Sequence, residues 1–187
     1  DATDIRNSNY NIKRNWYYNN PSDASLYGKK CNITDQTWLS TKSLFPAVTK
    51  FFYGRSEDLS LTGSYKDRMK FRLAETYLLL AEAYLGQNET QKAADAVNEV
   101  RKRAGASQIS ADDMTMDYLL DERIRELVGE ESRRFTLIRT NKLVDRVKAY
   151  NESIKDKINS DHALWPIPQS IIDSNRDVVF PQNPGYK

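Results

Sequence analysis

The chain has 187 residues, close to the size of one domain, and its 28 basic and 26 acidic residues give a formal net charge of +2. This near balance argues against a basic surface for nucleic acid or anionic lipid. Cys31 and His162 are the single cysteine and the single histidine, which excludes an internal disulfide and a metal site with several cysteine or two histidine ligands. With one cysteine and one histidine, we expect neither a metal nor another cofactor. No stretch approaches the ~20 apolar residues of a transmembrane helix.

Residues 1–70 show no sustained helical period and are rich in Asn, Ser, Thr and aromatic residues. Residues 15–23 carry the pattern of an extended chain that enters a turn, and we expect loops and short strands in this region. The candidate ligand-contacting side chains are the aromatic and amide residues that cluster here: Trp16, Tyr17, Tyr18, Asn19, Asn20 and Trp38.

Two interpretations of this aromatic cluster are open. In carbohydrate sites, flat aromatic rings stack on the apolar faces of sugars, and Asn, Asp and Arg side chains bond the hydroxyls. In a loop-rich core, the same rings would be packed inside with only their polar tips at the surface. The composition is compatible with both.

Residues 71–150 are predicted to be helical. Over 71–85, apolar residues recur at helical spacing and continue on other faces, which predicts a largely buried helix. Gly86 is expected to end it at positive φ, and Asn88 to cap a second helix as part of a capping box with Gln91. Gly105 should end that helix, whose apolar stripe is Ala93, Ala96, Val97, Val100 and Ala104. The short connection predicts an antiparallel helix hairpin.

This hairpin has the length of a tetratricopeptide repeat. With Ala74 at the first position, Ala81, Tyr84 and Ala93 supply the small, aromatic and small residues that this repeat needs where its helices cross. One repeat cannot bury its own face. Further helices over about 116–131 and 132–150, the latter broken near residues 140–141, are the expected packing partners.

We therefore expect a mainly α-helical protein in which residues 1–187 form a single domain. An irregular aromatic-rich region (1–70) precedes the repeat-like helical region (71–150). A Pro-rich tail (151–187) follows and should run extended across the helical layer, because its prolines prevent a long helix.

A catalytic interpretation finds little support in the sequence. No nucleophile-elbow, phosphate-loop or dinucleotide motif is present, and His162 is the only histidine base available. Acidic pairs such as Glu122/Glu126 alternate with arginines on predicted helices, which indicates a salt-bridged helix face.

One set of charges is expected to be structural. Arg72, Glu75 and Glu82 lie on one stripe of a helix that should be buried, and buried charges need partners. Arginines of the later helices can supply them. We expect a charge network formed by Arg72, Glu75, Glu82, Arg123 and Arg133.

Several blocks, in order, resemble the C-terminal part of the SusD/RagB family across about residues 71–187. They are FRLAE (71–75), LAEA (80–83), AVNEVRKRAG (96–105), DERIREL (121–127), EESRRF (130–135), LWPIPQS (164–170) and QNPGY (182–186). Two departures stand out: Glu130-Glu131-Ser132 replaces the usual Glu-Gly, and residues 136–139 replace an Asp-Leu-x-Arg run.

The resemblance implies a non-catalytic lipoprotein on the outer-membrane surface of Bacteroidota, which captures glycans and delivers them to a TonB-dependent, SusC-like transporter. It also implies tetratricopeptide-like helix pairs that carry a loop-rich binding face. Family members are longer, so we expect this chain to be a C-terminal portion, with the lipid anchor outside it. Trp165 is expected to pack on the helices.

Two alternatives come from other classes. A tetratricopeptide-like interaction scaffold would bind a peptide on the helix hairpin and keep the aromatic residues in the core; buried indoles at Trp16 and Trp38 would favour it. A glycoside hydrolase would need two facing carboxylates about 5–10 Å apart.

Overall fold

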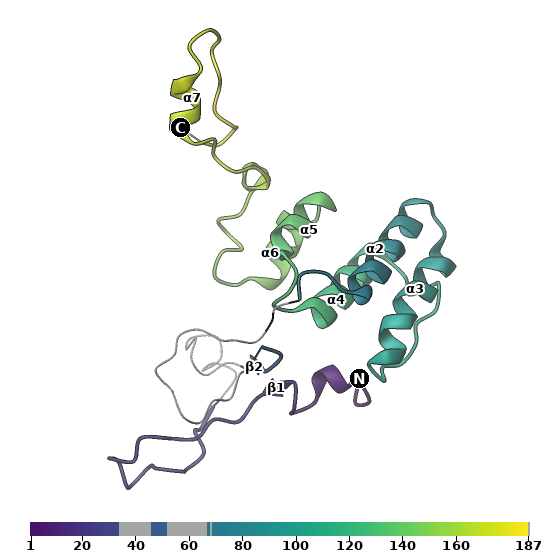
Figure 1. Cartoon of the computed structure of the whole chain (residues 1–187), viewed down its shortest axis with the longest axis vertical. Helices are drawn as coiled ribbons and strands as arrows, with labels where there is room; N and C mark the ends of the chain where they lie inside the picture. The colour runs from purple at the N-terminus through teal and green to yellow at the C-terminus, as the bar shows by residue number, and fades with distance from the viewer. Residues whose placement is uncertain (34–45, 52–66, 68, 187) are drawn as a thin grey trace. The chain divides into compact units, whose positions relative to one another are not determined.

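The computed structural model describes residues 1–33, 46–51, 67 and 69–186, and the chain separates into two units, Asp1–Glu131 and Ser132–Lys187 (Figure 1). The first unit joins most of the irregular region to three helices. Helices prevail and one two-stranded sheet is present among these residues, which confirms the predicted mainly α-helical class. That residues 1–187 act as a single domain stays a prediction.

The N-terminal segment contains short elements only. The 3-10 turn η1 (Ile5–Asn7) begins at Asp4, whose side chain accepts a hydrogen bond from the Arg6 amide. Strand β1 (Ile12–Lys13) pairs antiparallel with β2 (Ala47–Val48), so that Ile12 lies opposite Val48. Such a small sheet has little stability of its own and depends on its attachment to the helices.

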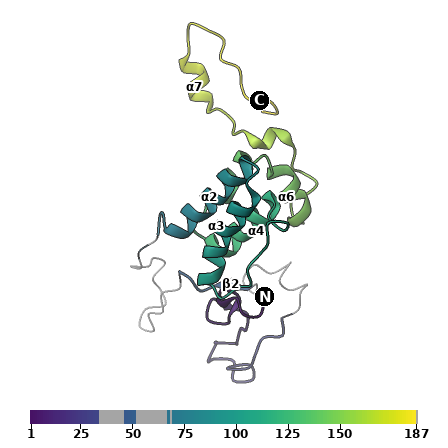
Figure 2. The ribbon, with the colours of Figure 1, turned by 90° about the vertical axis from the view of Figure 1, so that its right-hand side faces the viewer.

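Helices α2 (Leu73–Gly86), α3 (Thr90–Arg103) and α4 (Met116–Leu127) build the core of the first unit (Figure 2). The predicted stripe of α3 is buried as expected, and its small alanines allow α2 to approach closely. The buried core cluster consists of Leu78, Ala81, Ala93, Ala94, Ala96, Val97, Val100, Met114, Leu119 and Leu127.

Helix α2 is less buried than the sequence predicted. Leu78 and Ala81 are fully buried, but Leu73, Leu79 and Leu80 are 67%, 43% and 41% exposed. The prediction of a largely buried helix is therefore wrong for this chain, because α3 and α4 cover only part of its apolar surface.

The connection between α2 and α3 also corrects the sequence analysis. Gly86 is the last residue of α2, and the positive φ falls on Asn88, at 60°. The amides of Asn88 and Glu89 donate to the carbonyls of Leu85 and Tyr84, at 3.0 and 2.9 Å. This is a Schellman ending, in which Asn88 closes α2 and does not cap α3. Gly105, at φ 67°, ends α3 in the same way, as predicted.

The second unit contains α5 (Arg133–Arg139), α6 (Leu143–Tyr150), the 3-10 turn η2 (Ser160–Ala163) and the short α7 (Gln169–Ser174). Asn141, at φ 54°, separates α5 from α6, which confirms the predicted break. The tail is not extended throughout, because α7 forms directly after Pro168. Its extended parts are joined by the Gln182 amide, which bonds both the amide and the carbonyl of Ile167, at 2.7 and 2.8 Å.

Within the described ranges, no helix combines the length and the apolar character that crossing a membrane requires.

Candidate functional site

Residues 16–31 form a narrow hairpin that carries most of the predicted ligand-contacting residues. Tyr17 pairs with Lys30, and the amide of Cys31 donates to the carbonyl of Trp16 at 2.8 Å. The Tyr18 amide donates to Lys29 at 3.0 Å, while the amide of Gly28, at φ 75°, donates back to Tyr18 at 2.8 Å. This is a bulge in which glycine takes the left-handed position, and it increases the local twist of the hairpin.

The aromatic residues of this hairpin differ in exposure. Tyr17 and Tyr18 are 57% and 42% exposed. Trp16 is half-buried, with the Lys13 ammonium 4.2 Å from the centre of its ring. Its buried indole N–H has no hydrogen-bond partner among the residues that the structure describes. Because side chains alternate along an extended strand, Tyr17 and its two neighbours occupy opposite faces.

The turn of the hairpin is organised by an aspartate. The Asp23 carboxylate accepts hydrogen bonds from the amides of Ser25 and Leu26, at 3.1 and 3.3 Å. The Ser25 hydroxyl and these amides lower the pKa of Asp23. This arrangement fixes Tyr27, which is 57% exposed and which the predicted set omitted.

The remaining predicted ligand-contacting residues are Asn19, Asn20 and Trp38. Asn20 accepts a hydrogen bond from the Ser22 amide at 3.1 Å, so one of its polar groups already serves the turn. Asn19 is exposed beside it. Trp38 lies outside the described residues.

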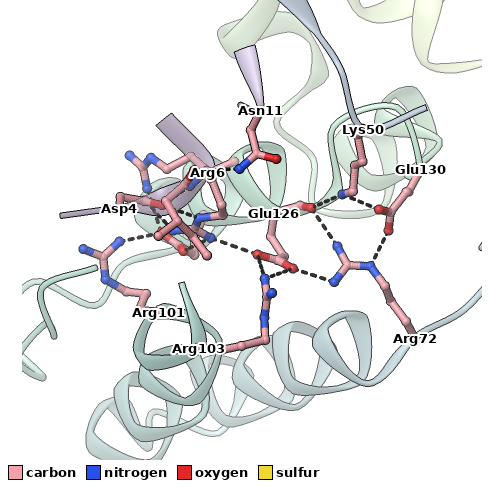
Figure 3. A network of polar contacts seen from close by, with 12 residues as sticks. Asp4, Arg6, Asn11, Lys50, Arg72, Arg101, Arg103, Glu126 and Glu130 are labelled. Carbon is pink, nitrogen blue, oxygen red and sulfur yellow. Dashed lines mark hydrogen bonds and ion pairs between the residues drawn. The ribbon is translucent and has the colours of Figure 1, made fainter. Parts of the chain in front are cut away.

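A network of buried charges holds the N-terminal segment against α3 and α4 (Figure 3). Its centre is Glu126 of α4, whose side chain is 1% exposed. Its carboxylate accepts from Arg72 at 2.5 Å, from Arg103 at 2.8 and 2.9 Å, and from Arg6 at 3.1 Å. One turn earlier, Glu122 pairs with Arg6, Arg101 and Arg125 at 2.8, 2.7 and 2.9 Å.

A second group of contacts attaches the residues after β2 and the start of α2 to the C-terminal end of α4 and the residues that follow it. The Arg72 guanidinium bonds Glu130 at 2.5 Å, and Lys50 forms an ion pair with the same carboxylate. Both cations also donate to the Glu126 carbonyl, at 2.7 and 2.8 Å. Burial would raise the pKa of Glu130, but the hydrogen bonds from Arg72 and Lys50 outweigh it and lower that pKa. The Arg6 guanidinium likewise lowers the pKa of Asp4.

The predicted charge network overlaps with the observed contacts only in part. Arg72 pairs with glutamates of α4 and of the residues that follow it, whereas Arg123 lies 3.6 Å from Glu75 and 3.4 Å from Glu131. Glu82 lies on α2, and Arg133 begins α5 in the second unit. Sequence reasoning missed Arg6 and Lys50, because both lie in a region without helical periodicity.

A cavity of about 700 Å³ opens between the N-terminal segment and helices α3 and α4. Its volume falls in the range of small-ligand pockets. The walls combine apolar and charged side chains, among them Ile5, Ile12, Ile124, Tyr118, Arg103 and Arg125. Because the cavity lies beside the buried glutamates, its arginines are largely neutralised. The mixture suits a polar, uncharged ligand.

Two other predicted features lie in the second unit. His162 takes part in a capping box with Asn159 at the start of η2, which is a structural role. Trp165 is 60% exposed, with the Arg134 guanidinium 4.6 Å from the centre of its ring. Within the second unit, Trp165 thus contacts α5, and its packing on the other helices stays a prediction. No group of three or more metal-ligating side chains occurs in the part of the chain that the structure describes.

Comparison with known proteins places this arrangement in a family. The model of the SusD family matches residues 2–186. The chain belongs to the SusD family. Proteins of this family bind ligands without catalysing a reaction, which confirms the prediction of a non-catalytic protein.

Individual SusD family members show what share of a relative's length this chain covers. SusD-like protein P25 of Formosa agariphila is 30% identical over 158 residues, which cover 80% of this chain and 30% of that protein. SusD-like protein P38 of the same organism is 31% identical over 108 residues, covering 52% and 20%. The chain thus spans less than a third of the length of these relatives.

Two solved structures of SusD type are also similar. BT4246 superimposes with a TM-score of 0.52 at 27% identity, covering 66% of this chain and 24% of that protein. A laminarin-binding SusD-like protein gives a TM-score of 0.49 at 29% identity, covering 64% and 23%. The first match supports the predicted fold. That this portion is C-terminal stays a prediction.

Proposed function

We propose that this chain is part of a surface glycan-binding protein that passes oligosaccharides to a TonB-dependent, SusC-like transporter in the outer membrane. Family membership supports binding without catalysis. The polar faces and loops would contact the transporter.

The observation that carries the proposal is the exposed aromatic hairpin. Tyr17, Tyr18 and Tyr27 expose roughly half of their surface on a backbone that is fixed by cross-strand hydrogen bonds and by the Asp23 turn. A ring that is rigid before binding loses little conformational entropy when a sugar stacks on it. Amide side chains at positions 19 and 20 lie next to these rings and can bond hydroxyl groups.

Native affinity electrophoresis against a panel of soluble polysaccharides, laminarin included, tests this function. We expect at least one polysaccharide to retard the chain, and Tyr17→Ala/Tyr18→Ala to weaken its binding about fivefold or more, since one stacked ring contributes roughly 1 kcal/mol beyond area burial. The single variants then identify which face of the hairpin binds. Tyr150→Ala is the matched control, because this tyrosine is 72% exposed but lies on α6.

Equal retardation of wild type and the double variant would locate binding elsewhere, with the cavity beside α3 and α4 as the next candidate. No retardation by any polysaccharide would favour the interaction scaffold. The half-buried indole of Trp16 is compatible with that alternative.

A further inference from the structure

Arg14 connects the base of the aromatic hairpin to the turn η1. Its Nη1 donates to the carbonyl of Asn7 at 3.1 Å and to the side-chain oxygen of Asn9 at 3.4 Å. Its Nη2 donates to the side-chain oxygen of Asn7 at 2.5 Å. We propose that Arg14 is a positioning residue, which fixes the direction in which the hairpin leaves the helical core.

The contacts on the far side of η1 reach the helices without interruption. The Ile5 amide donates to the carbonyl of Ala104, at the end of α3, at 2.9 Å. Arg6 pairs with Asp4 at 2.8 Å and with Glu122 and Glu126 of α4. The turn η1 is therefore held firmly on the helical core, and a side chain that bonds to this turn is fixed relative to the core as well.

Among the residues that the structure describes, the hairpin has few other contacts at this end, one of them between the Lys13 ammonium and the Trp16 ring. Two-stranded hairpins are marginally stable alone, and β1, which precedes Arg14, contributes two residues to its sheet. Beyond residue 14, the backbone hydrogen bonds among the described residues of the hairpin run between its own two strands or within its turn. Within the described part of the chain, the Arg14 guanidinium is thus the side chain that bonds the base of the hairpin to the turn η1.

The chemistry of the contact requires arginine. The acceptors are neutral oxygens of Asn7 and Asn9, two of them on Asn7, and the planar fork of a guanidinium can hold both of these at once. A lysine keeps the charge but offers one compact donor group, so it cannot fix the angle. The proposal therefore predicts that the hairpin is positioned less firmly in Arg14→Lys than in the wild type, although both side chains carry the same charge.

Double electron–electron resonance measures this positioning without any ligand. The full chain carries one nitroxide at Ala24→Cys, in the turn of the hairpin, and one at Lys102→Cys on α3, in a Cys31→Ser background. Lys102 is 63% exposed, so its label leaves the core intact. We expect a narrow distance distribution for Arg14, a broad one for Arg14→Lys, and an unchanged melting temperature, because Arg14 lies outside the buried core.

Lys29→Ala is the matched control, since it removes an exposed cation of the same hairpin and leaves the backbone pairing in place. Asn7→Ala should broaden the distribution as Arg14→Lys does, and the double variant should add nothing further. An Arg14→Lys distribution as narrow as that of the wild type would overturn the proposal.

The consequence for ligand affinity rests on the proposed function. Glycan affinity of Arg14→Lys should fall about fivefold, because one net hydrogen bond contributes ~1 kcal/mol. If the distribution broadens but no polysaccharide binds even the wild type, the positioning role stands and the glycan function fails.

Discussion

Replacing Glu126 by Gln removes the negative charge at the centre of the buried network and keeps the shape of the side chain. Three guanidinium groups contact this carboxylate, at distances between 2.5 and 3.1 Å, and its side chain is 1% exposed. Removing one partner from a buried ion pair costs about 3–5 kcal/mol. Arg72 retains Glu130, and Arg6 retains Asp4 and Glu122, so neither is left alone. The lower end, about 3 kcal/mol, is therefore expected.

Urea unfolding followed by circular dichroism at 222 nm measures this change. A loss of about 3 kcal/mol corresponds to a fall of roughly 6–12 °C in melting temperature for a chain of this size. Glu99→Gln is the control, because Glu99 is 51% exposed and pairs with Lys102 at 3.5 Å on the surface of α3. If Glu126→Gln and Glu99→Gln unfold at the same urea concentration, the network does not stabilise the fold and the reasoning is refuted.

Two further predictions follow from local geometry and from charge. Gly129→Ala should destabilise the chain by about 1–3 kcal/mol in the same urea assay, because a Cβ at φ 76° would lie 2.6 Å from the Phe51 ring; Gly86→Ala, with no atom within 4 Å, should not. The pKa values of Asp4 and Glu130 are lower in the folded state than their ordinary values of 3.8 and 4.5. Both ionised carboxylates therefore stabilise the folded state when the pH lies above these ordinary pKa values. Stability should decline as the pH falls through the lower, folded values, and an Asp4→Asn/Glu130→Gln variant that declines as steeply as wild type would contradict this.

Helix α3 shows what periodicity can predict. Its stripe of small apolar residues was expected at helical spacing, and all five members are buried. The ending at Gly105 followed from the tolerance of glycine for positive φ. In both cases the signal is local, since it depends on residues within one or two turns of helix.

The start of α3 shows where local signals compete. Asn88 satisfies two rules, as an N-cap of the next helix and as a left-handed ending of the previous one. The second prevails, because its Schellman bonds satisfy the last carbonyls of α2 before the chain turns. The sequence contains no information that ranks the two.

The charged residues of α4 show which properties can be predicted from the sequence and which depend on the tertiary structure. The sequence by itself determined the helical class, the hairpin of α2 and α3, the family and the aromatic character of the first region, because these depend on composition, local spacing and ordered blocks. Only the tertiary structure decided that Glu122 and Glu126 are buried and that Arg6, Lys50 and Arg14 attach the N-terminal segment and its hairpin. A carboxylate looks the same in sequence on an exposed or a buried helix face, and its burial depends on cations that lie up to 120 residues away in the sequence, as Arg6 does from Glu126.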